Sequence, residues 1–231
     1  MNTMKVIAGL AAVSFGAIAL NASATISSGR CPTTNTSGFD CMEWTDSGNW
    51  YHTTQNDWFG PGGTSGTGDT FPFTGETSLR CGVGLDCTLT LNGQARMNTE
   101  TGDDFSIRVI DGSVTGGILC GLVDLNFNPY WYADDDSEET TWDDNSFISN
   151  PGTLAPYTGF ATGSIGNINF SVSALGINIS NGHMHDVQFH NNGVGSPGSY
   201  FAFNGPIYNP GHVESGCEIS GDLYYNDANA W

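Results

Sequence analysis

The chain has 231 residues, of which 24 are Asp or Glu and only five are Lys or Arg, so its formal net charge at pH 7 is −19. Such a charge repels the phosphates of nucleic acids and anionic lipids, which argues against nucleic-acid binding and against binding to anionic membranes. The length is sufficient for one domain with a sizeable core.

Residues 1–24 have the organisation of an export signal. Lys5 precedes an apolar run at 6–20, and residues 22–24 (Ala-Ser-Ala) match a cleavage site. The apolar run is too short and too weakly hydrophobic for a stable membrane span. We therefore expect a secreted or cell-surface protein with no transmembrane segment after cleavage. It would retain four arginines, no lysine and a charge of −20.

Six cysteines follow the export signal, and in an oxidising compartment they predict three disulfides. Fifteen pairings are open, but proximity along the chain favours the first cysteine with the second and the third with the fourth. The fifth and sixth would then close a long loop, which stabilises the fold by about 4–5 kcal/mol. No Cys-x-x-Cys pair occurs, so we do not expect a cysteine metal site. The candidates, in chain order, are Cys31, Cys41, Cys81, Cys87, Cys120 and Cys217.

Period-2 alternation of apolar and polar residues is the main structural signal. Residues 85–91 place Leu or Cys at every odd position and polar residues between them, and 105–109, 123–127 and 168–174 repeat the pattern. No window after the export signal shows a sustained helical period. The sequence predicts an all-β chain, with a single antiparallel β-sandwich or jelly-roll domain over 76–231 that has long loops and is stapled by disulfides.

Several of these strands carry a resemblance to a known family. Residues 87–93 (CTLTLNG), 112–120 (GSVTGGILC) and 129–131 (PYW) resemble the alkane oxidation protein activator (PraB) family, and 217–223 (CEISGDL) is similar to its closing cysteine strand. Members are exported proteins associated with bacterial growth on hydrocarbons. The resemblance implies a non-catalytic factor that contacts or emulsifies hydrocarbon, and it supplies no catalytic residues.

Residues 25–75 are rich in Gly, Ser, Thr and Pro, and we expect a loop-rich region there. Trp44, Trp50 and Trp58 lie within it. Exposed aromatic rings could stack on sugars or lie against an apolar surface, so these three are the candidate ligand-binding residues. The alternative is that they close the open end of a small core.

A run of carboxylates follows residue 133. Asp134, Asp135 and Asp136 begin it, and calcium prefers several oxygen ligands of this kind. We therefore name them as candidate metal ligands, with calcium as the one cofactor considered. The spacing is not that of an EF-hand loop. The alternative is a solvated acidic loop.

Three histidines lie close together later in the chain. On a strand, His183 and His185 would project from one face, as two ligands of a metal must. His190 has the opposite parity and could join them only through a bulge. These three are the second set of candidate metal ligands. The alternative is that they are polar residues on a strand face.

Catalytic signatures are missing from the sequence. There is no Gly-x-Ser-x-Gly elbow and no phosphate-binding glycine loop, and nothing selects a glycosidase pair among 24 acids. We expect a non-catalytic protein whose partner is an apolar or glycan surface. The alternatives are a carbohydrate-binding module and a structural subunit of an extracellular fibre or matrix that self-assembles through strand edges.

Overall fold

A computed structural model describes residues 26–31, 41–54, 57–62, 69–98, 104–135, 141–148, 159–192, 198–225 and 228–230. The predicted export signal at 1–24 lies outside these ranges, so it stays a prediction. Within them, no helix has both the length and the apolar character needed to cross a membrane.

Nine strands form the main sheet. They are β4 (Phe71–Arg80), β5 (Gly84–Asn98), β6 (Asp104–Gly116), β7 (Val123–Asn126), β8 (Trp131–Asp134), β9 (Gly159–Val172), β10 (Ile177–Asn191), β11 (Ser199–Asn209) and β12 (Val213–Tyr225). Two short 3-10 turns interrupt them, η1 (Cys120–Leu122) and η2 (Ser173–Leu175). Each strand pairs with its neighbours in antiparallel fashion.

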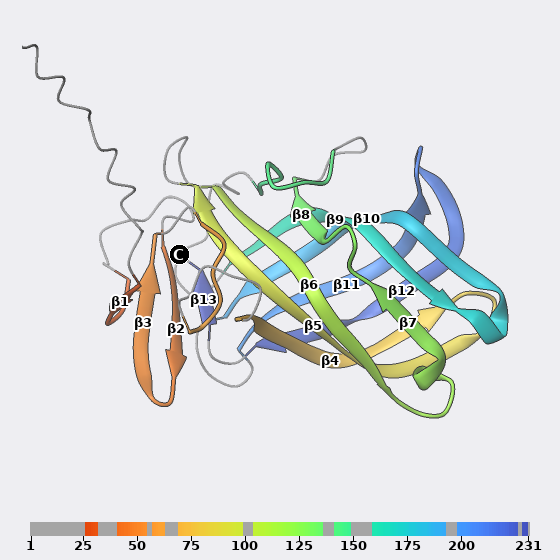
Figure 1. Ribbon diagram of the computed structural model, residues 1–231, viewed down its shortest axis with the longest axis horizontal. Helices are drawn as coiled ribbons and strands as arrows, with labels where there is room; N and C mark the ends of the chain where they lie inside the picture. The colour runs from red at the N-terminus through yellow and green to blue at the C-terminus, as the bar shows by residue number, and fades with distance from the viewer. Residues whose placement is uncertain are drawn as a thin grey trace, which may run out of the picture.

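The main sheet closes on itself. Its order runs β10-β11-β12-β4-β5-β6-β8-β9, and β9 also pairs with β10, so eight strands form a closed barrel (Figure 1). The short β7 pairs with β9 beyond the end of β8. Gly75 and Gly221 permit close approach at the β4–β12 seam, because a Cβ at either would collide with backbone of the opposite strand.

The alternating residues fill the barrel interior, as the sequence predicts. The odd positions of 85–91 are buried, and Phe105, Ile107, Val109, Ile168 and Phe170 are buried with them. The inward positions of β5 stay odd along its length, so Ala95 and Met97 also reach the core. A register shift opposite Asn92 and Gly93 instead reverses the parity of β6, whose inward positions change from Val109 to Val114. The interior is therefore a packed apolar core, as is usual for eight strands.

A small second sheet covers one end of the barrel. It contains β1 (Ser27–Ser28), β3 (Asn49–Thr53), β2 (Met42–Asp46) and β13 (Ala228–Ala230), in that order, and lies at the left in Figure 1. Trp44 of β2 packs on Phe59 and Phe71, with ring centroids 5.7 and 5.8 Å apart. These rings seal that end of the core.

The structure confirms an all-β, disulfide-linked chain and changes two finer expectations. The main sheet is a closed barrel, not clearly a sandwich or jelly roll, because β9 and β10 complete the ring instead of leaving two facing sheets. The region expected to be loop-rich contains β2 and β3, and the barrel begins at Phe71. The sequence did not predict strand β2 because the strand buries a charged residue, Glu43, which pairs with Arg30 at 2.7 Å.

One of the three favoured disulfides is confirmed. Cys31 pairs with Cys41 as expected, but the other two bonds join Cys81 to Cys217 and Cys87 to Cys120. Sequence proximity is misleading here, because a strand extends by about 3.3 Å per residue and carries Cys87 away from the β4–β5 turn. Cys81 instead lies beside β12, which pairs with β4.

The two loop lengths predict unequal contributions to stability. Cys81–Cys217 spans 136 residues and Cys31–Cys41 spans 10. On loop-closure entropy, replacing both cysteines of the long loop with serine lowers the free energy of unfolding by about 5 kcal/mol, against about 3 kcal/mol for the short loop. Urea unfolding of the two double variants measures this difference. Equal losses would contradict it.

Candidate functional site

The end of the barrel opposite the small sheet carries exposed apolar side chains on its turns. Four turns meet there: β4–β5, β6–β7, β9–β10 and β11–β12 (right side of Figure 1). The side chain of Ile118 is 92% exposed and that of Val213 is 60% exposed. We call this set the apolar turns; its members are Val83, Ile118, Leu119, Leu122, Leu175 and Val213.

Most of the exposed large hydrophobic side chains lie at this end of the barrel. Among the described residues, only one other large hydrophobic side chain is comparably exposed, and that is Phe160 at the start of β9. It lies toward the other end of the barrel and stacks on His190, with centroids 5.2 Å apart. Clustered apolar exposure of this kind indicates an interaction surface more than it indicates chance.

Two disulfides brace the apolar turns. Cys81 lies in the β4–β5 turn and is bonded to Cys217 of β12, while Cys120 follows Leu119 in the β6–β7 loop and is bonded to Cys87 of β5. Each bond joins a turn to a barrel strand. The exposed side chains are therefore presented from anchored backbone.

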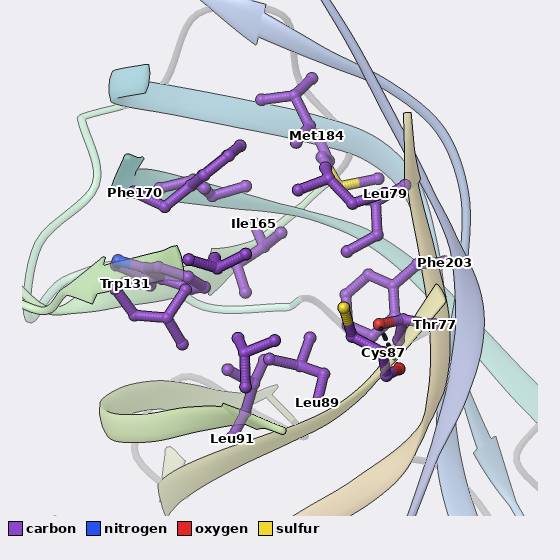
Figure 2. Close-up of a pocket in the computed structure, with 16 residues that line it drawn as sticks. Thr77, Leu79, Cys87, Leu89, Leu91, Trp131, Ile165, Phe170, Met184 and Phe203 are labelled. Atoms are coloured by element: carbon purple, nitrogen blue, oxygen red, sulfur yellow. Dashed lines mark hydrogen bonds between the residues drawn. The ribbon is translucent and has the colours of Figure 1, made fainter. Parts of the chain in front are cut away.

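A small apolar cavity lies inside the same half of the barrel. Its volume is about 60 Å³, and Figure 2 shows side chains from opposite walls pointing toward its centre. An engineered cavity of about 150 Å³ admits benzene, so this one is too small for a longer hydrocarbon without rearrangement. Its lining includes Leu79, Leu89, Trp131, Ile165, Phe170 and Phe203.

The three predicted tryptophans do not form a common platform. Trp44 is fully buried and its indole N–H donates to the Pro61 carbonyl at 2.8 Å, so it serves the alternative role of closing the core. This corrects its assignment as an exposed ligand-binding ring. Trp50 is partly exposed, with the Arg30 guanidinium 4.2 Å from its ring.

Trp58 lies apart from both, on the barrel wall. The guanidinium groups of Arg96 and Arg108 are 4.7 and 4.5 Å from its ring, and Tyr132 packs beside it. Arginine packed over an indole is a stabilising cation–π arrangement. Trp58 is therefore engaged by the protein's own cations.

The acidic candidates are only partly described. Asp134 ends β8 and its carboxylate accepts a 2.7 Å hydrogen bond from the Asp135 backbone N–H. Burial raises the pKa of Asp134. Asp136 lies outside the described residues, so calcium binding by this run stays a prediction.

The histidine candidates divide differently from the expectation. His183 and His185 lie together, but the third member of their group is His212, from the β11–β12 turn, and not His190. His190 packs flat on Tyr200 with centroids 4.3 Å apart. Among the described residues, these three histidines are the only group of three or more metal-ligating side chains with closely spaced donor atoms.

Sequence reasoning missed both the apolar turns and His212. The turns had one local signal: bulky Ile118 and Leu119 directly follow a Gly-Gly pair, where a turn normally carries polar residues. His212 had none, because it is 27 residues beyond His185 and reaches it only through the pairing of β10 with β11.

Comparisons of the chain with protein-family models, with curated proteins and with solved structures find no match.

The environment of His190 predicts a depressed pKa. Burial lowers the pKa of its imidazole, although Asp222 acts in the opposite direction. Between the folded pKa and the unfolded value of about 6.5, the unfolded chain binds more protons, so the free energy of unfolding decreases as the pH falls through that window. NMR titration of the imidazole gives the pKa, and a value above 6.5 would contradict this. Replacing His190→Gln should flatten the pH dependence of stability.

Proposed function

We propose that this is an exported, non-catalytic protein that contacts hydrocarbon through the apolar turns at one end of its barrel. The single observation that carries the proposal is the clustering of exposed apolar side chains on four turns that meet at that end. The resemblance of residues 87–131 to the alkane oxidation protein activators supports the same function, as does the export signal predicted at 1–24.

The charge of the chain favours a neutral apolar phase over a lipid bilayer. A formal net charge of −19 repels anionic headgroups, whereas an alkane carries no charge. The acidic body would stay hydrated while the turns enter the oil. Burying one fully exposed large aliphatic side chain contributes about 1.5–3 kcal/mol, so a few such residues suffice for strong adsorption.

The contact would be made by the surface of the protein and not by an enclosed pocket. The interior cavity of about 60 Å³ is too small for a long alkane. Adsorption would therefore coat or emulsify a hydrocarbon phase, and would not carry single molecules within the barrel.

The alternatives receive less support from the geometry. A glycan-binding platform built from Trp44, Trp50 and Trp58 is not supported, because Trp44 is buried in the core and cannot stack on a sugar. Assembly through strand edges is limited because each of the eight barrel strands pairs on both sides, which leaves β7 and the small sheet as the described edges.

Interfacial tensiometry of the mature protein against an alkane tests the proposal, with and without calcium. We expect the protein to lower the oil–water tension. The triple variant Ile118→Ser, Leu119→Ser, Val213→Ser should require at least a tenfold higher concentration for the same decrease, because each tenfold corresponds to about 1.4 kcal/mol. These side chains are exposed, so circular dichroism and thermal melting should show an unchanged fold.

A matched control comes from the opposite end of the barrel. Phe160→Ser removes a side chain that is 52% exposed but lies away from the apolar turns, and it should leave the tension curve unchanged. Failure of the wild-type protein to lower the tension, or an equal loss in control and triple variant, would overturn the proposal. Glycan-dependent tryptophan fluorescence would then favour a carbohydrate-binding module, and large assemblies on size exclusion would favour a fibre subunit.

A further inference from the structure

His183 and His185 lie on the outer wall of the barrel. Met184 between them is buried and lines the interior cavity, and successive side chains on a strand point to opposite faces. The two imidazoles therefore project outward from β10. Tyr208 of β11 pairs directly with His183, and His212 follows in the next turn.

The three imidazoles are close enough to share one ion. Their candidate ligand atoms all lie within 4.8 Å of one another. The ring centroids of His183 and His185 are 5.1 Å apart, and those of His185 and His212 are 5.0 Å apart. Nitrogens bound to one tetrahedral zinc are separated by about 3.4 Å, so the set must contract by on the order of 1 Å. His212 is exposed on its turn and stacks on Tyr208 with ring centroids 4.1 Å apart, so this ring is the one that would have to move.

His183 supplies a second, independent observation. Its side chain is only 6% exposed, and its Nε2 atom is buried without a hydrogen-bond partner in the structure. A buried polar atom of this kind is costly, and a bound ion would satisfy it.

The surroundings hold the first two rings in place. Nδ1 of His185 is 3.0 Å from the Ser164 hydroxyl, a contact that fixes the ring and directs Nε2 as the ligating atom. The indole of Trp142 stacks on His183 with centroids 6.3 Å apart. Asn167 accounts for the position of Trp142, because its Nδ2 donates to the Trp142 carbonyl at 2.9 Å.

We propose that His183, His185 and His212 form a binding site for a divalent transition-metal ion of the zinc or copper class. Three imidazoles suit these ions and do not suit calcium or magnesium, which prefer oxygen ligands. Three protein ligands leave a fourth position for water, which is the arrangement of an open zinc site. The three neutral ligands do not offset the charge of the ion, and the net charge of −19 on the chain favours its approach.

Isothermal titration of the untagged mature protein with zinc chloride, and separately with copper chloride, tests this site. We expect one ion per chain and a rise in melting temperature on binding. His212→Asn should weaken binding at least tenfold. Asparagine is the suitable replacement because residue 212 has a φ of 58°, a conformation that Asn tolerates and that needs no refolding of the turn.

The matched control is His190→Gln, which removes a histidine from the same strand but outside the cluster, and it should bind zinc as the wild type does. NMR should show that zinc shifts the resonances of the three imidazoles and leaves those of His190 in place. The site would be refuted by the absence of zinc and copper binding below about 100 μM, by equal affinity in His212→Asn and wild type, or by equal competition from calcium chloride. None of these outcomes depends on hydrocarbon adsorption, so the two proposals fail separately.

Discussion

Pairing between β9 and β10 is the constraint on which the rest of the structure depends. It converts a row of antiparallel strands into a closed barrel. Closure gives each strand one inward and one outward face, and the alternating apolar residues then have a single interior to fill. It also collects the turns at two ends. Without closure, the apolar turns would lie in a row along the strand ends of an open sheet and would not form one surface.

The two ends of the barrel differ in how far their apolar side chains are covered. At one end, Trp44, Phe59 and Phe71 close the core beneath the small sheet, and Tyr225 packs on Phe71 with centroids 5.5 Å apart. At the other end, the apolar side chains remain exposed on turns anchored by disulfides. Exposed aliphatic residues are costly in water, and their retention at one end is the observation on which the proposed contact with an apolar phase rests.

Local patterns in the sequence predict the barrel strands well and the connections between them poorly. Period-2 alternation identifies the inward residues of β5, β6 and β9, because that signal depends only on which face is buried. Closure, the partner of Cys81 and the burial of Trp44 depend on contacts between distant segments, and no local pattern encodes these. Glu43 shows the same limit: its charge suggests exposure, and only the tertiary pairing with Arg30 and the Cys31 N–H explains its burial.

The histidines show how far parity reasoning extends. It correctly places His183 and His185 on one face. It also assigns His190 to the opposite face, but a register shift between Met184 and Val187 reverses the parity of β10, so Phe189 is buried and His190 lies on the outer face, stacked on Tyr200. It cannot find His212, which the β10–β11 pairing brings into the group. This residue also connects the two proposals, because Val213 follows it directly and belongs to the apolar turns. An ion held by all three histidines would tie the β11–β12 turn to β10, and would thereby fix the position of Val213, one of the residues through which we propose contact with an apolar phase.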